Sequence, residues 1–147
     1  MKKHILLIDD DKAELIAFLK ALKLTTASFK CTYAKNASHA TELLRYLNPD
    51  YIFFDAHLES AETHRMIQTI HNKRALLGCR YFLYTREITA ELKRRAVELG
   101  AAGCIIKTAI TAALADMLSV ALGERKDLPQ PSIAGYPIPQ GQQSNAV

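Results

Sequence analysis

Five short apolar runs recur along the chain and are separated by longer amphipathic segments. The runs are His4–Ile8, Phe29–Tyr33, Tyr51–Phe54, Tyr81–Tyr84 and Cys104–Ile106. All except the second lack a clear alternation of polar and apolar residues. Short continuous apolar runs are typical of strands that are covered on both faces in a parallel sheet. We therefore predict five strands, four of them fully buried.

The segments between the runs carry apolar residues at the spacing of amphipathic helices. The predicted helices contain Leu15, Ile16, Leu19 and Leu22; Ala40, Leu43, Leu44 and Leu47; Met66, Ile67 and Ile70; Thr89–Leu99; and Ala109–Leu122. For the second helix we expect a cap at Asn36 or Ser38 and an end at Asn48-Pro49. Gly100 and Gly123 are expected to end the last two helices. Strands that alternate with helices five times predict a doubly wound α/β fold with right-handed crossovers.

The composition divides the chain into two parts. Of its 147 residues, 49% are hydrophobic and 23% are charged, as in a globular protein and unlike a disordered chain. Residues 124–147, in contrast, contain four of the five prolines together with several Gln and Gly residues. We expect one domain over residues 1–123 and an extended Pro/Gln-rich tail over residues 124–147, with no separate output domain.

The distribution of charged and apolar residues disfavours several classes of protein. No apolar run approaches the ~20 residues that cross a bilayer, and the segment MKKHILLIDDD is too short in apolar residues for a signal peptide. The net charge of +4 comes from bases that are scattered apart from Lys73-Arg74 and Lys93-Arg94-Arg95. Such short runs favour solvated helix faces over a nucleic-acid interface. We therefore expect no membrane partner and no direct nucleic-acid partner.

The cysteines indicate the compartment. Cys31, Cys79 and Cys104 are odd in number, and they form neither a CxxC pair nor a metal-ligand cluster. Reduced thiols in a reducing compartment are the simplest interpretation. We therefore expect a cytoplasmic protein.

Polar residues directly follow four of the five predicted strands. Asp9, Asp10 and Asp11 follow the first run, Asp55 the third, Thr85 the fourth and Lys107 the fifth. The second run ends without an obvious polar candidate. In an open parallel sheet, ligands bind beyond the carboxyl ends of the strands. We therefore expect these side chains to converge on one crevice.

A cluster of carboxylates at this edge predicts a cation. Three carboxylates repel by about 4 kcal/mol per pair at about 4 Å and an effective dielectric of about 20, so either some are protonated or a cation lies among them. Hard oxygen ligands without His or Cys suit Mg²⁺ or Mn²⁺. With Lys107 and the Thr85 hydroxyl, such a site would neutralise and hold a phosphoryl group. Asp55 is the candidate nucleophile, because an aspartate can form an acyl phosphate.

Each of these residues also has a simpler interpretation when it is taken alone. A single aspartate after a strand is often a helix N-cap, and Asp11 fits that role. A single Thr or Lys after a strand is unremarkable. The occurrence of an acid pair, Asp55, Thr85 and Lys107 at successive strand ends favours a common site over coincidence.

In these motifs the sequence resembles the receiver domain of two-component response regulators. The segments ILLIDDD, NPDYIFFD, YFLYT and AVELGAAGCIIK match the pattern of that family in order and spacing, over roughly residues 3 to 123. The resemblance implies a flavodoxin-like fold, in which a parallel sheet of five strands in the order 2-1-3-4-5 is flanked by five helices.

The resemblance also implies a metal site. Asp9 and Asp10 would be the acidic pair that binds Mg²⁺ (or Mn²⁺), with Asp10 as a direct ligand. Asp55 and the backbone carbonyl of His57 would complete the protein's share of the ligands.

Asp55 would accept a phosphoryl group from the phosphohistidine of a sensor histidine kinase, or exchange it with a histidine phosphotransfer protein. Thr85 would then bond a phosphoryl oxygen and Lys107 would pair with the phosphate. The expected function is that of a stand-alone receiver that signals through contacts with a downstream protein. It is not expected to be an enzyme, although it would assist its own Mg²⁺-dependent phosphorylation and dephosphorylation.

The sequence departs from the family pattern at two positions near the lysine. Thr108 replaces the proline that usually follows it, and Cys104 replaces the aromatic residue three positions before it. A receiver-like interaction module that is not phosphorylated therefore remains an alternative. His57 and Glu87 occupy positions that tune phosphorylation rates in the family, or are solvated loop residues. A flavin- or nucleotide-binding protein is disfavoured, because no Gly-rich loop follows the first run.

Overall fold

The computed structural model describes residues 2–26, 28–58 and 61–123 and contains one parallel sheet. Its strands are β1 (Lys3–Ile8), β2 (Phe29–Ala34), β3 (Tyr51–Asp55), β4 (Arg80–Thr85) and β5 (Gly103–Ile106). They lie in the order β2-β1-β3-β4-β5, and each neighbouring pair is parallel. The predicted fold class and strand order are confirmed.

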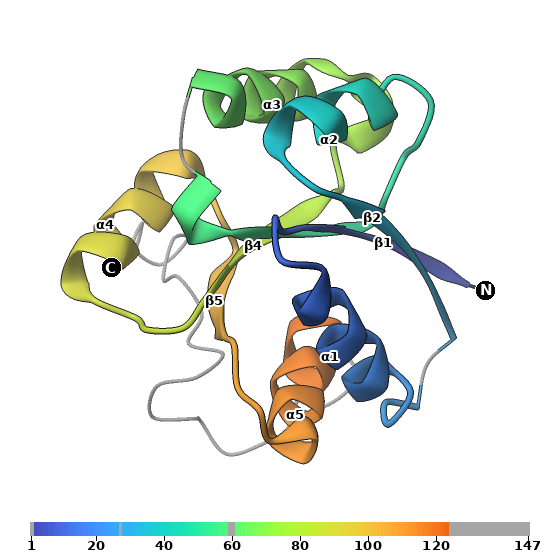
Figure 1. Ribbon diagram of the computed structural model, residues 1–147. Coiled ribbons are helices and arrows are strands. Elements are labelled where there is room, and N and C mark those ends of the chain that lie inside the picture. Colours follow the sequence, from blue (N-terminus) through green and yellow to red (C-terminus); the bar gives the residue numbers. More distant parts are fainter. Residues whose placement is uncertain (1, 27, 59–60, 124–147) are drawn as a thin grey trace.

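Helices cover both faces of the sheet (Figure 1). The α-helices are α1 (Lys12–Leu22), α2 (Ala37–Leu43), α3 (Ala61–Asn72), α4 (Ala90–Leu99) and α5 (Thr111–Ala121). Two short 3₁₀ helices, η1 (Ala56–Leu58) and η2 (Arg74–Leu76), follow β3 and α3. In Figure 1, α2 and α3 lie above the sheet, whereas α1 and α5 lie together below it. No helix among the described residues is both long enough and apolar enough to span a membrane.

The core has two layers because successive residues of a strand point to opposite faces of the sheet. Toward α2, α3 and α4 the buried strand residues are Leu6, Ile8, Ala34, Ile52, Phe54, Tyr81, Leu83 and Cys104. Toward α1 and α5 they are Ile5, Leu7, Phe53, Phe82, Tyr84 and Ile105. Phe53 stacks on Phe82 with ring centroids 5.1 Å apart. Burial on both faces holds the strands in place, and with them the polar residues at their ends.

Side-chain caps fix the starts of two helices. The Asp11 carboxylate accepts a hydrogen bond from the Ala13 N–H at 2.9 Å, which makes Asp11 the N-cap of α1, as predicted. The Asn36 side chain accepts from the His39 N–H at 2.8 Å and caps α2, so the cap is Asn36 and not Ser38.

The end of α2 differs from the prediction. The helix ends at Leu43, several residues before Asn48-Pro49, and the chain continues in turns. The Tyr46 N–H bonds the Leu43 carbonyl, which tightens the last turn, and the Lys73 ammonium bonds the Leu44 and Leu47 carbonyls. Carbonyls that the helix leaves free are thus satisfied by a lysine from the segment between α3 and η2, a long-range contact that local sequence pattern does not report.

The other predicted helix ends are close to the observed ones. Thr89 caps α4 through the Leu92 N–H, and Gly100 ends it in the left-handed conformation with φ of 79°. α5 begins at Thr111, slightly later than the predicted Ala109. The predicted tail, residues 124–147, lies outside the described residues.

Candidate functional site at the carboxyl edge of the sheet

The parallel strands bring their carboxyl ends to one edge of the sheet, where the predicted residues meet. Asp9 follows β1, Asp55 and Thr85 end β3 and β4, and Lys107 follows β5. All four are buried, with Lys107 the most exposed at 8%. Asp10 is exposed to solvent. The site therefore has a buried charged floor and one acidic residue at its mouth.

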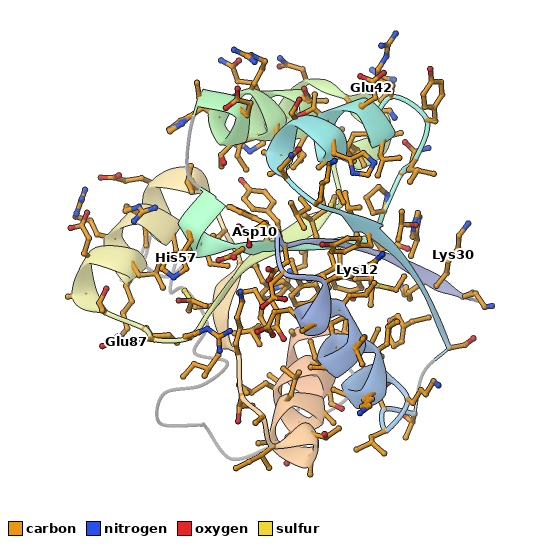
Figure 2. The ribbon with its side chains drawn as sticks, in the orientation of Figure 1. Asp10, Lys12, Lys30, Glu42, His57 and Glu87 are labelled. Atoms are coloured by element: carbon orange, nitrogen blue, oxygen red, sulfur yellow. The ribbon has the colours of Figure 1, made fainter. Side chains whose placement is uncertain are left out.

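Three carboxylates converge at this edge. Oxygen atoms of Asp9, Asp10 and Asp55 all lie within 4.8 Å of one another, and this is the only such group of potential metal ligands among the described residues. In Figure 2, Asp10 lies near the middle of the view, between His57 on the left and Lys30 on the right. The predicted convergence of the acidic residues is thus observed.

Lys107 lies between two of these carboxylates. Its Nζ is 2.7 Å from Asp9 Oδ2 and 3.2 Å from Asp55 Oδ2. It also lies 5.3 Å from the centroid of the Tyr84 ring. Burial acts to lower the pKa of Lys107, but the interactions with Asp9 and Asp55 outweigh it and raise the pKa above its usual value. The lysine therefore carries a positive charge in the floor of the site.

Asp9 is held by the backbone that follows it. Its Oδ1 accepts a hydrogen bond from the Asp11 N–H at 2.9 Å. Burial raises the pKa of Asp9, and the nearby Asp55 adds to the increase, although Lys107 and the Asp11 N–H act in the opposite direction. A carboxylate whose charge is opposed by burial gains from an additional cation, which is consistent with a metal at this position.

Asp55 is oriented in a similar way. Its Oδ1 accepts a hydrogen bond from the His57 N–H at 2.9 Å, so the backbone of η1, which directly follows Asp55, orients the carboxylate. The His57 side chain itself is exposed. One oxygen of Asp55 is thus bonded by backbone while the other lies beside Lys107.

The Thr85 hydroxyl is engaged by its own loop. It donates to the Glu87 carbonyl at 3.0 Å, and it accepts from the Glu87 N–H at 3.3 Å. The backbone of Thr85 is tied to the lysine, because the Lys107 N–H bonds the Thr85 carbonyl at 2.6 Å. A groove of about 390 Å³ lies between η1, the β4–α4 loop and α4, and Thr85, His57 and Glu87 are among its lining residues.

The donor set fits a divalent metal. Three carboxylates from two strand ends provide hard oxygen ligands in one small region, and Asp10 is open to solvent. Mg²⁺ and Mn²⁺ prefer such ligands, and Mg²⁺ keeps several waters.

The two departures from the family pattern have clear structural positions. The peptide bonds of the described residues, Lys107–Thr108 included, are all trans. The Thr108 hydroxyl accepts from the Ile110 N–H at 3.1 Å and so forms a turn before α5. Cys104 is 1% exposed in the same buried cluster as Leu83 and Leu92, and burial raises the pKa of its thiol to about 11. Cys104 therefore packs as a small apolar residue of the core.

Two features near the site are missing from the sequence-based prediction. The Tyr33 hydroxyl, from the edge strand β2, donates to the Asp9 carbonyl, so the second strand does contribute a polar group. Arg86, the residue after Thr85, forms an ion pair with Glu14 of α1. The Tyr33 hydrogen bond is not predictable, because an aromatic residue in an apolar strand looks like an ordinary core residue. The Arg86–Glu14 ion pair joins residues too far apart in the chain for a local pattern to reveal it.

A family model identifies the class of protein. The model described as response regulator receiver domain matches residues 5–119. The chain therefore belongs to the response regulator receiver domain family, which confirms the resemblance seen in the sequence. No curated protein matches the chain.

Three similar solved structures show the same fold. The phosphorylated cyanobacterial phytochrome response regulator RcpA is 20% identical, with 82% of this chain and 91% of that chain covered and a TM-score of 0.67. A response regulator from Thermotoga maritima is 21% identical, with coverages of 82% and 97% and a TM-score of 0.67. The Mn²⁺-bound form of response regulator Rcp1 is 18% identical, with coverages of 88% and 99% and a TM-score of 0.67.

Membership of this family defines the kind of function. Receiver domains are signalling domains of two-component systems, where they interact with histidine kinases. They bind a divalent metal at a cluster of aspartates.

Proposed function

We propose that this protein accepts a phosphoryl group on Asp55 from a histidine kinase or a histidine phosphotransfer protein. The observation that supports this most directly is the position of the Asp55 carboxylate. It is buried at the end of β3, with one oxygen bonded by the His57 N–H and the other 3.2 Å from Lys107 Nζ. A nucleophile held in this way needs little reorganisation to react.

Asp9, Asp10, Asp55 and the backbone carbonyl of His57 would hold Mg²⁺ or Mn²⁺. When bound, the ion would neutralise charge on the phosphoryl oxygens and on the carboxylates. Asp10, which is exposed, would receive the ion from solvent, and the buried Asp9 would gain a second cation besides Lys107.

The reaction is a transfer of the phosphoryl group to oxygen. A carboxylate oxygen of Asp55 attacks phosphorus, the N–P bond of the phosphohistidine breaks, and the imidazole leaves with the electron pair and takes up a proton. Lys107 would then pair with a phosphoryl oxygen. The Thr85 hydroxyl would donate to another, which requires it to give up its bond to the Glu87 carbonyl.

The modified state would be read through protein contacts. Residues 1–123 would form the receiver and a downstream protein would bind its altered surface. A cytoplasmic location is supported by the free cysteines Cys31, Cys79 and Cys104.

Phosphorylation with a small donor tests the proposal. Wild-type protein incubated with acetyl phosphate and Mg²⁺ is expected to gain the mass of one phosphoryl group, and Asp55→Asn is expected to gain none. Asp116→Asn, which changes an exposed carboxylate on α5, is the matched control and should behave as wild type. Modification of Asp55→Asn to the wild-type extent would contradict the proposal.

An unmodified wild-type protein would also contradict it, provided that beryllofluoride with Mg²⁺ leaves the amide NMR signals unchanged. That pair of results would favour an interaction module that works without phosphorylation, for which the small buried Cys104 in place of an aromatic residue provides a reason.

A further inference from the structure

An ion pair connects helix α1 to the loop that follows β4. Arg86 Nη2 lies 2.9 Å from Glu14 Oε2, although 72 residues separate the two in the chain. The Glu14 side chain is only 13% exposed, whereas the Arg86 side chain is 65% exposed. Glu14 is therefore held by its surroundings on α1, whereas Arg86, in the loop, is the partner with more freedom to move.

The loop held by this pair contains Thr85. Arg86 is the next residue after Thr85 and lies inside the tight turn formed by the two hydrogen bonds between the Thr85 hydroxyl and the Glu87 backbone. These bonds direct the hydroxyl toward its own loop. Among the described residues, no hydrogen bond joins the Thr85 side chain to the three aspartates of the site.

For the Thr85 hydroxyl to donate to a group on Asp55, it has to give up its bond to the Glu87 carbonyl, and we expect the turn over residues 85–87 that this bond closes to rearrange. Arg86 lies at the middle of that turn, so its bond to Glu14 resists the rearrangement. Thr85 is buried, and its carbonyl accepts a hydrogen bond from the Lys107 N–H, so its backbone is held in place. The exposed loop residues that follow Thr85 are therefore the ones that move, and Arg86 is the first of them.

Other ion pairs of the same region do not have this position. Arg94 pairs with Glu91 and Glu98, but all three residues lie on α4 and are more than half exposed. Breaking those pairs leaves α1 and the β4–α4 loop connected as before. Arg94 therefore provides a control with similar chemistry and no link to α1.

We propose that Glu14 and Arg86 are positioning residues, whose ion pair holds the β4–α4 loop in the conformation that keeps Thr85 away from Asp55. This inference rests on the proposed function, because it concerns how easily the modified state of Asp55 forms. Loss of the pair releases the loop and makes the modified state more accessible.

Binding of beryllofluoride, a mimic of the phosphoryl group, measures this effect. The beryllofluoride concentration at half-saturation is determined with Mg²⁺ from the amide NMR shifts of Glu87 and Lys107. Glu14→Gln and Arg86→Gln are each expected to lower it roughly two- to fivefold, the range for a partly exposed pair. The double variant should show no more than the effect of either single variant, because the two residues act as one unit.

The two single variants separate positioning from a direct charge effect. If the charges acted only through their field at the site, removal of the negative Glu14 would strengthen binding of the anionic mimic and removal of the positive Arg86 would weaken it. The proposal instead predicts the same direction for both. Arg94→Gln should leave the midpoint unchanged.

Opposite directions for the two single variants, additive effects in the double variant, or an equal effect of Arg94→Gln would each overturn the inference while leaving the proposed function intact. The same holds if both variants bind beryllofluoride as wild type does. A wild-type protein that does not respond to beryllofluoride would overturn the proposed function, and the inference with it.

Discussion

Lys107 Nζ lies 2.7 Å from Asp9 Oδ2 in the interior of the protein, where the two side chains are 4% and 0% exposed. A buried carboxylate without a partner costs several kcal/mol, because the charge loses its hydration. The lysine thus has a structural role in addition to the proposed contact with phosphate, and removing it leaves Asp9 and Asp55 with only each other as charged neighbours on the floor of the site.

Lys107→Met is expected to lower the free energy of unfolding by about 3 kcal/mol in metal-free buffer, because it leaves a buried charge uncompensated. Urea unfolding with EDTA measures this change. Excess Mg²⁺ should recover part of the loss, since a divalent cation at the aspartates replaces the missing charge. Lys30→Met, on the exposed side of the edge strand β2, should change stability by no more than about 0.5 kcal/mol. Equal effects of the two substitutions would contradict the structural role.

Gly100 and Gly123 offer a matched comparison. Both have positive φ, 79° and 78°, so alanine costs about 1–2 kcal/mol at either position. At Gly100 the added Cβ would also lie 2.9 Å from the Tyr81 hydroxyl, whereas at Gly123 it meets nothing within 4 Å. Gly100→Ala should therefore be the more destabilising by thermal or urea unfolding, and the difference should shrink in a Tyr81→Phe background. The contact would be irrelevant if the two alanine variants were equally stable.

The arrangement of the acidic site follows largely from the sequence, because a parallel topology places the carboxyl ends of all the strands at one edge of the sheet. Once Tyr51–Phe54 and its neighbours are assigned as parallel strands, the residues after them must share an edge. Asp9 and Asp55 are then close because β1 and β3 are adjacent, whereas β4 separates Lys107 from Asp55 and the long lysine side chain makes the contact. Their chemical roles remain predictions, because proximity does not establish transfer.

Long-range side-chain contacts are not predictable in this way. The Glu14–Arg86 pair depends on the distance between α1 and the β4–α4 loop, which is set by the packing of α1 under the sheet. The carbonyls after the early end of α2 are bonded by Lys73, which lies far away in the chain. Each is decided by tertiary structure, on which local periodicity has no bearing.

Tyr81 should make stability sensitive to alkaline pH. Its hydroxyl donates to the Leu99 carbonyl and lies 3.1 Å from His71 Nε2, and burial raises its pKa to about 12, with a smaller contribution from Cys79. Between about pH 10, the ordinary pKa of tyrosine, and pH 12, the unfolded chain has lost this proton and the folded chain keeps it. The free energy of unfolding therefore falls as pH rises through this range, by no more than about 1.4 kcal/mol per pH unit.

Comparison with Tyr81→Phe isolates this effect. At neutral pH the wild type should be the more stable by about 1 kcal/mol, because it makes the hydrogen bond to Leu99. The difference should narrow as the pH is raised from 10 to 12 in urea unfolding experiments. Tyr46→Phe, which changes a ring that is 74% exposed, should keep a constant difference from wild type. A gap between wild type and Tyr81→Phe that stays constant up to pH 12 would contradict the prediction.

Asp10 and Asp11 are adjacent acidic residues with different expected effects on metal binding. An Asp10 oxygen lies within 4.8 Å of oxygens of Asp9 and Asp55, whereas the Asp11 carboxylate caps α1 through the Ala13 N–H. Asp10→Asn should weaken Mg²⁺ binding by at least roughly tenfold, because it removes one charged ligand from an already small set. Asp11→Asn should bind Mg²⁺ nearly as wild type and keep its stability, since Asn is an equally good N-cap. Isothermal titration calorimetry measures both affinities. If Asp11→Asn lost as much affinity as Asp10→Asn, general negative charge would explain the binding and the assignment of Asp10 as a ligand would be wrong.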